Sequence, residues 1–284
     1  MYDLTNRKVV YSLCDEFGFR FKKAFGQNFL TDASVLRAIA EAAGEHGVLE
    51  IGPGFGTLTG YLAENAEKVV AVELDRALFP VLEKTLGEYD NVSIREGDVM
   101  KIDLPALLKE EFDGQEVSVA ANLPYYITTP IITRLLEEKL PIRALVLMMQ
   151  KEVADRILAD PGTKDYGALS LFVRYYADAS LLVSVPKESF VPAPKVDSAV
   201  LVLMRREVPP VSPIDEKLFF GLIRAGFAQR RKTFVNAASS AGLPGVTKEG
   251  VAKALCALEI DEKVRGEVLS IEQYCEIANF LLKN

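Results

Sequence analysis

The motif Asn122-Leu123-Pro124-Tyr125 combines residue types that could bind an aromatic amine. Proline restricts the preceding residue to an extended backbone, so the Leu123 carbonyl and the Asn122 side chain can point in one direction. These two oxygens would accept the hydrogens of an NH₂ group, while the Tyr125 ring stacks on the attached aromatic ring. An ordinary Asn-x-Pro turn with a buried tyrosine has the same residue types. The motif therefore favours an amine site only if it lies at a ligand-binding edge.

A glycine-rich turn, Gly52–Gly56, follows the apolar run Gly47–Ile51. Glycines at a turn from strand to helix let a ligand approach the backbone at the helix N-terminus, although helix–strand packing can also require glycine. Thr57 stands where a dinucleotide-binding turn has Gly or Ala. The turn therefore predicts a ligand loop, and it argues against a nicotinamide cofactor without excluding one.

Three polar residues lie at the ends of the next predicted strands. Glu73 ends the second strand, 21 residues after Gly52, while Asp98 follows the third and Asn122 the fourth. The carboxyl ends of parallel strands share one edge, where open α/β sheets bind ligands. One carboxylate suits a ribose diol and a second suits an exocyclic amine, so the set predicts an adenosine pocket. Either acid alone could instead cap a helix or hold a loop.

The elements that must position these residues alternate between strand and helix from about residue 33. Helices of ordinary length between strands predict βαβ units and a parallel sheet. Two later strand-like runs, 180–185 and 198–204, are joined by a proline-containing loop instead of a helix, which predicts an antiparallel end to the sheet. The other expected strands are 47–51, 69–74, 92–95, 117–121 and 142–149, and the expected helices are 33–43, 57–65, 76–86 and 130–139.

A proline-rich stretch at 208–213 is the clearest linker, and the pattern after it is purely helical. We therefore predict an α/β domain over 1–207 with an N-terminal extension at 1–30, a linker at 208–214, and a helical domain over 215–284. Residues 1–19 carry no interpretable motif. The expected helices of the second domain are 216–225, 232–241, 248–258 and 271–282.

Composition excludes several classes of protein and of site. The 284 residues are 49% hydrophobic and 26% charged, as in soluble globular proteins. No run approaches the ~18 apolar residues of a membrane span, and residues 1–8 lack the order of a signal peptide. The single histidine, His46, argues against a catalytic triad, and three scattered cysteines indicate neither disulfides nor a zinc cluster. We expect a cytoplasmic protein without a metal.

Charge is distributed unevenly along the chain. The net charge is −7, but residues 211–284 hold 10 basic and 9 acidic side chains, so the rest carries −8. Such an acidic domain would contact a polyanion only through small basic clusters, although an exposed basic face without a partner is the simpler alternative. One cluster is Arg230, Arg231 and Lys232, expected on a helix beginning near Arg230, together with Arg224 one or two turns earlier. The other cluster is Arg20, Lys22 and Lys23.

Together, the glycine turn, the strand-end acids and the Asn122–Tyr125 motif resemble a class I S-adenosylmethionine methyltransferase acting on adenine N6. Three further stretches narrow this resemblance to the KsgA/RsmA family, the small-subunit ribosomal RNA adenine dimethyltransferases. It extends from about residue 20 to the end and implies a Rossmann-like sheet, mostly parallel with an antiparallel last strand, plus a small all-α C-terminal domain. The stretches are FGQNFLTD at 25–32, FVPAPKVDS at 190–198 and FAQRRKT at 227–233.

The resemblance implies a role for each matching residue. Glu73 would bind the ribose hydroxyls of S-adenosylmethionine and Asp98 its adenine amine. Residues 229–232 would contact RNA phosphates. The remaining cofactor residues would be Asn28 and Leu30 at the methionine end, Gly52 and Gly54 in the loop, and Asn122. The target adenine would be held by Asn122, Leu123, Pro124 and Tyr125, with Phe190 covering its other face.

The implied reaction is methyl transfer to N6 of two adjacent adenosines in a 3′-terminal hairpin of 16S rRNA. The expected partner is small-subunit rRNA within an immature 30S particle, and the expected state is a monomer. The alternatives are a large-subunit rRNA adenine methyltransferase of the macrolide-resistance type and a non-catalytic ribosome-assembly factor. A nicotinamide-dependent oxidoreductase would share the fold but would leave the Asn122–Tyr125 motif unexplained.

Overall fold

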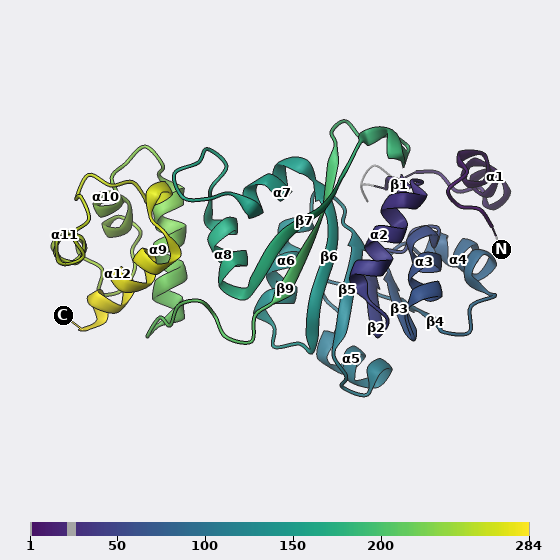
Figure 1. Cartoon of the computed structure of the whole chain (residues 1–284), viewed down its shortest axis with the longest axis horizontal. Coiled ribbons are helices and arrows are strands. Elements are labelled where there is room, and N and C mark those ends of the chain that lie inside the picture. Colours follow the sequence, from purple (N-terminus) through teal and green to yellow (C-terminus); the bar gives the residue numbers. More distant parts are fainter. Residues whose placement is uncertain (1, 22–26, 284) are drawn as a thin grey trace. The chain divides into compact units, whose positions relative to one another are not determined.

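The computed structural model describes residues 2–21 and 27–283, which Figure 1 shows as a ribbon. The chain forms two compact units. The first runs to Ala154 and also contains Asp178–Arg205, whereas the second consists of Asp155–Ala177 and the chain from Arg206 onward. Among the described residues, no helix is both long and apolar enough to cross a membrane.

The first unit is built on a seven-stranded sheet in the order β4-β3-β2-β5-β6-β9-β7. Strands β2 to β6 pair in parallel, and β9 pairs with β6 in the antiparallel sense. This confirms the predicted Rossmann-like sheet with an antiparallel last strand. The strands are β2 (Gly47–Ile51), β3 (Lys68–Glu73), β4 (Val92–Glu96), β5 (Val117–Asn122), β6 (Ile142–Gln150), β7 (Ala177–Val185) and β9 (Ser198–Arg205).

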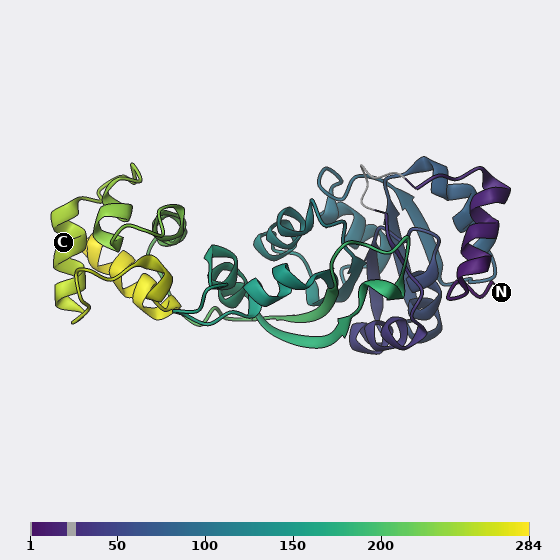
Figure 2. The ribbon, with the colours of Figure 1, turned by 90° about the horizontal axis from the view of Figure 1, so that it is seen from above.

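The central strands are nearly continuous apolar runs because both faces of the sheet are covered. Figure 2 shows helices on both sides of it. Buried strands of this kind carry Val, Ile and Leu without alternation, as the wholly buried Val69 and Val70 illustrate. The helices of this unit are α1 (Arg7–Phe17), α2 (Ala33–Ala43), α3 (Thr57–Asn65), α4 (Phe79–Leu86), α5 (Leu104–Phe112) and α6 (Thr128–Glu137), with short 3₁₀ turns at Arg76–Leu78 and Lys187–Ser189.

A small second sheet joins two segments that are far apart in the sequence. Strand β1 (Phe29–Leu30) pairs antiparallel with β8 (Phe190–Val191), which sets Leu30 opposite Phe190. The chain then enters α2, where the Asp32 carboxylate caps the helix by accepting from the backbone N–H groups of the first turn. The β1–β8 pair therefore fixes the chain that leads into the first helix of the sheet domain.

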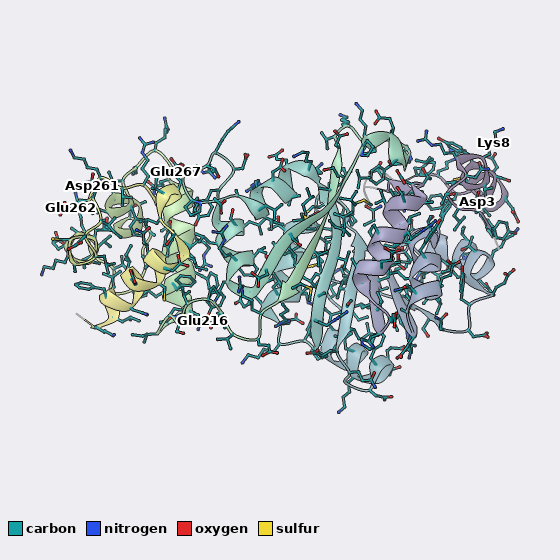
Figure 3. All side chains as sticks on the ribbon, in the orientation of Figure 1. Asp3, Lys8, Glu216, Asp261, Glu262 and Glu267 are labelled. Atoms are coloured by element: carbon teal, nitrogen blue, oxygen red, sulfur yellow. The ribbon has the colours of Figure 1, made fainter. Side chains whose placement is uncertain are left out.

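The second unit consists of helices around its own apolar core. That core contains Phe219, Phe234 and Tyr274, all wholly buried. Figure 3 marks Asp261, Glu262 and Glu267, which lie between α11 and α12 in the chain. The helices are α8 (Ala168–Tyr176), α9 (Glu216–Ala228), α10 (Phe234–Ser239), α11 (Lys248–Ala257), α12 (Ile271–Lys283) and the 3₁₀ turn Gly266–Val268, while α7 (Lys151–Leu158) spans the boundary between the units.

The boundary differs from the predicted one at residue 207. Helix α8 precedes β7 in the chain, yet it groups with the helical unit. The reason is its apolar face, because Leu171 and Tyr175 are buried in the same cluster as Phe219 and Leu222. The chain therefore crosses between the units three times, and the proline-rich stretch follows the last of these crossings. Helices α1, α5, α7 and α8 were not predicted from the sequence.

Candidate functional site

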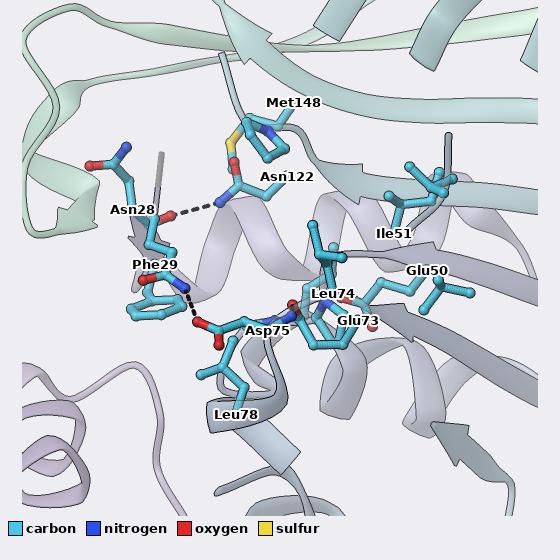
Figure 4. Close-up of a pocket in the computed structure, with 18 of the residues that line it drawn as sticks. Asn28, Phe29, Glu50, Ile51, Glu73, Leu74, Asp75, Leu78, Asn122 and Met148 are labelled. Carbon is cyan, nitrogen blue, oxygen red and sulfur yellow. Dashed lines mark hydrogen bonds between the residues drawn. The ribbon is translucent and has the colours of Figure 1, made fainter. Parts of the chain in front are cut away.

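A pocket opens at the carboxyl ends of the parallel strands, within the first unit (Figure 4). The structure brings together at this pocket every residue that the sequence assigned to the cofactor, and their binding roles remain predictions. The residues come from the turns after β2 and β4, from the last positions of β3 and β5, and from β1 and the residue before it, as expected for an open α/β sheet. They are Asn28, Leu30, Gly52, Gly54, Glu73, Asp98 and Asn122.

The glycine turn needs glycine for its backbone conformation. Gly52, Gly54 and Gly56 have φ values of 71°, 60° and 85°, in the left-handed region that other residues rarely adopt. At Gly54 an added Cβ would lie 2.6 Å from the Phe29 ring. The turn thus packs tightly against β1 and leads directly into α3, whose first N–H groups are unpaired within the helix.

Glu73 is held at the base of the pocket by the backbone. Its side chain is buried and accepts the Asp75 N–H at 2.7 Å and the Gly54 N–H at 3.4 Å. Burial raises the pKa of Glu73, while these hydrogen bonds act in the opposite direction. The carboxylate therefore bridges the glycine turn and the turn after β3, where it can meet a ligand that lies across both.

Asp98 holds its own turn and also lines the pocket, while its role at a ligand remains a prediction. Its Oδ1 accepts the Met100 N–H at 2.9 Å, and its Oδ2 lies 3.4 Å from Lys101 Nζ. These contacts stabilise the turn after β4. The residue still lines the pocket, so the turn presents a partly exposed carboxylate to a ligand.

Glu50 is a pocket residue that the sequence reasoning missed. It lies in the apolar strand β2, is 1% exposed, and its Oε2 finds no hydrogen-bond partner among the described residues. Burial, together with the nearby charge of Glu73, raises the pKa of Glu50 to about 8. The available signal was an acid inside the apolar run Val48-Leu49-Glu50-Ile51, because a carboxyl group there is expected to be buried, and a buried acid in a cleft is a candidate functional residue.

The Asn122–Tyr125 turn is fixed by its surroundings. Figure 4 shows the Asn122 amide directed at the Asn28 carbonyl, to which Nδ2 donates at 2.8 Å. The Leu123 N–H donates to the Met148 carbonyl at 3.0 Å, and the Thr128 hydroxyl donates to the Pro124 carbonyl at 3.1 Å. Because the Asn122 Nδ2 already donates this hydrogen bond to Asn28, the Oδ1 atom of Asn122 remains as the hydrogen-bond acceptor of the side chain.

The two aromatic residues assigned to the target base have different settings. Tyr125 is half-buried, and its hydroxyl lies 2.9 Å from Ser198 Oγ. Phe190 is 1% exposed and belongs to the core beside Leu30, so its ring does not line the pocket as described. Tyr126, which the sequence reasoning passed over, is 59% exposed and does line it. Neither Tyr125 nor Phe190 lines the pocket as described, and their roles on the two faces of the target base remain predictions.

The basic residues of the second unit differ in what they contact. Arg230 donates to the carbonyls of Lys164 at 3.0 Å and Tyr166 at 2.7 Å, which anchors the segment before α8. Arg231 and Lys232 are exposed, as is Arg224 on α9. The prediction that a helix begins near Arg230 was wrong. Residues 229–232 form the turn between α9 and α10, in which the Lys232 N–H donates to the Gln229 carbonyl at 2.9 Å.

The basic cluster of the first unit is only partly described. Arg20 is exposed just after α1. Lys22 and Lys23 lie outside the described residues. The RNA-binding roles of both clusters remain predictions.

Comparisons with known proteins agree with this geometry. The family model "Ribosomal RNA adenine dimethylase" matches residues 18–283. Relatives from Bacillus cytotoxicus and Bacillus mycoides, both named ribosomal RNA small subunit methyltransferase A, are 49% identical over 99% of this chain and 98% of their own.

Two solved structures resemble both units of the chain. A dimethyladenosine transferase from Plasmodium falciparum has a TM-score of 0.74 and 27% identity, covering 88% of this chain and 95% of its own. The 23S rRNA methyltransferase ErmE has a TM-score of 0.67 and 25% identity, covering 89% and 99%. With the family model matching from residue 18 to residue 283 and relatives 49% identical along almost the full length, the chain belongs to the ribosomal RNA adenine dimethylase family.

Proposed function

We propose that this chain dimethylates N6 of two adjacent adenosines in a 3′-terminal hairpin of 16S rRNA, within immature 30S particles. Membership of the family makes it an S-adenosylmethionine-dependent rRNA adenine dimethyltransferase. The choice of the small subunit rests on one observation, the 49% identity to relatives named small subunit methyltransferase A. The large-subunit enzyme ErmE shares the fold but only 25% of its residues.

The pocket residues fit the cofactor by charge and by hydrogen-bonding groups. Glu50 offers a buried carboxylate oxygen without a partner among the described residues, which suits the cationic methionine end of S-adenosylmethionine. Glu73 would bind the ribose hydroxyls, and Asp98 the adenine amine. Asn28 and Leu30 would border the methionine part, beside the loop of Gly52 and Gly54. Bound cofactor supplies a methyl group that its sulfonium already activates.

The chain's own residues would orient the target amine. Asn122 Oδ1 would accept one N6 hydrogen, since its Nδ2 already donates to the Asn28 carbonyl, and the Leu123 carbonyl would accept another. These bonds favour a more tetrahedral nitrogen, whose lone pair is otherwise delocalised into the ring. Dimethylation requires the pocket to accept a monomethylated amine, so one of the two bonds must be dispensable.

Positioning would supply much of the rate, and no general base is needed. The N6 proton becomes strongly acidic once the methyl group has transferred, so solvent can take it. The target base must leave its stack, at a cost of a few kcal/mol. Stacking on Tyr125 would offset this cost by about 1–3 kcal/mol. Phe190 could cover the other face only after its ring leaves the core.

A direct assay tests the small-subunit assignment. The full chain would be incubated with labelled S-adenosylmethionine and small subunits from cells lacking this modification, and in parallel with protein-free 23S rRNA. We expect N6,N6-dimethyladenosine, identified by mass spectrometry of nucleosides, in the small-subunit reaction alone. Modification of 23S rRNA alone would establish the large-subunit alternative. Tight binding to small subunits without any methyl transfer would favour the assembly-factor alternative.

A further inference from the structure

We propose that Ser198 is a positioning residue for the reaction, whose hydroxyl fixes the Tyr125 ring in place to stack on the target adenine. The proposal rests on the proposed function, because it assumes that Tyr125 meets the base. Ser198 Oγ and Tyr125 Oη lie 2.9 Å apart, and the Ser198 side chain is wholly buried at the start of β9. The two residues are 73 positions apart, so the bond joins the turn after β5 to a different strand.

The position of Ser198 is itself set from two sides. In the antiparallel pairing of β6 with β9, Ser198 lies opposite Gln150, the last residue of β6. The residue before it, Asp197, accepts the Lys187 N–H on its Oδ1 and the Lys151 N–H on its carbonyl, both at 3.0 Å. Because the backbone around Ser198 is tied to β6 and to the turn before β8, its hydroxyl is a fixed point against which a ring can be oriented.

The Tyr125 ring needs such a point. Hydrogen bonds at Leu123 and Pro124 hold the backbone of its turn. A half-buried tyrosine can still rotate about its two side-chain torsions unless packing or a hydrogen bond selects one rotamer. The hydrogen bond to Ser198 selects one rotamer of Tyr125 through its hydroxyl, so the face of the ring stays available for stacking. A ring held in advance lets the flipped base stack without first ordering the tyrosine.

The test compares Tyr125→Phe, Ser198→Ala and the double variant in single-turnover methylation of undermethylated small subunits. Each single change removes the same hydrogen bond, so we expect about a 5-fold loss of rate at saturating substrate, the factor that one ordinary hydrogen bond represents. The double variant should lose the same factor, because its two changes act through one bond. The KM for small subunits and the Kd for S-adenosylmethionine should stay unchanged.

A matched control separates positioning from general packing. Ser118 is also a buried strand serine, near the start of β5 and away from the Asn122 end. Among the described residues, its hydroxyl accepts one long hydrogen bond, at 3.5 Å from Arg143. Ser118→Ala should retain the wild-type methylation rate. Tyr125→Phe removes only the hydroxyl group and keeps the ring, so its methylation rate still tests the role of the hydrogen bond if Ser198→Ala fails to fold.

Three results would overturn the proposal. They are wild-type rates in Tyr125→Phe, losses that multiply to about 25-fold in the double variant, and a loss expressed in KM rather than in turnover. A wild-type chain that methylates no small subunits would instead refute the proposed function and not this contact.

Discussion

Glu50 provides the sharpest test of how the pocket handles charge. Its pKa rises from an ordinary 4.5 to about 8, because the folded protein buries the carboxyl group without a partner for Oε2 among the described residues. Between these two pH values the native state binds this proton more tightly than the unfolded chain does. Stability conferred by the neutral acid is therefore present at low pH and is lost as pH rises toward 8. Glu50→Gln keeps the shape and removes the titration.

The expected magnitude follows from the size of the shift. At about 1.4 kcal/mol per pKa unit, the change corresponds to a penalty of about 5 kcal/mol in the wild type above pH 8. A domain of this size shifts its melting temperature by about 2–4 °C per kcal/mol. Glu50→Gln should therefore match the wild type near pH 5 and melt about 10 °C higher at pH 9, measured by calorimetry without cofactor.

Cofactor binding should respond in the opposite direction. If the Glu50 carboxylate meets the cationic end of S-adenosylmethionine, the wild type must release a proton to bind below pH 8. Its affinity relative to Glu50→Gln should then rise by as much as tenfold per pH unit up to about 8 and level off above. Because both proteins bind the same cofactor, the ratio of their affinities at each pH does not depend on the titration of the cofactor's own amine. A melting difference that does not change with pH, or an affinity ratio that stays flat, would refute the reasoning.

The remaining predictions concern the other parts of the site. Glu73→Ala should weaken S-adenosylmethionine binding by about 1.5–3 kcal/mol per charged hydrogen bond lost, and calorimetry showing normal affinity would remove its assigned role. Asn122→Ala should slow single-turnover methylation by about 10²–10³, by analogy with the loss of one preorganised transition-state contact, with little change in cofactor affinity. Arg231→Ala/Lys232→Ala should flatten the salt dependence of small-subunit binding by about one log–log unit per phosphate contact, measured by filter binding. Arg230→Ala should instead lower the melting temperature, because this side chain anchors the segment before α8.

The sheet and the edge of the site were predictable because their signals are local. A buried strand followed by glycine, or by a strand-end acid, can be recognised without knowing what packs against it. Once the strands are parallel, Gly52, Glu73, Asp98 and Asn122 must meet at one edge. The cap at Asp32 is equally local, since it involves residues two and three positions away.

The features that escaped prediction depend on contacts across the sequence. Arg230 and its neighbours have side chains that suit a helix, whereas in the structure Arg230 lies in a turn and its side chain donates to the carbonyls of Lys164 and Tyr166, which are more than 60 positions away. Helix α8 sits between two sheet strands in sequence, and its membership of the helical unit is decided by partners more than 40 residues away. The burial of Phe190 also depends on a distant partner, because its strand pairs with the strand of Leu30.

The hydrogen bond between Asn122 and the Asn28 carbonyl links the two halves of the site. The family resemblance implies that Asn28 borders the methionine part of the cofactor, and its contact with Asn122 at 2.8 Å uses the backbone oxygen of Asn28. Substituting Asn28 would leave that oxygen in place, so the orientation of the Asn122 amide depends on the path of β1 and not on the residue type. That path is fixed by pairing with β8, the strand that also carries Phe190. The segment beside the cofactor, the amide that would hold the target amine and the strand assigned to its other face are therefore parts of one connected structure, although Leu30 and Phe190 are 160 positions apart in the sequence.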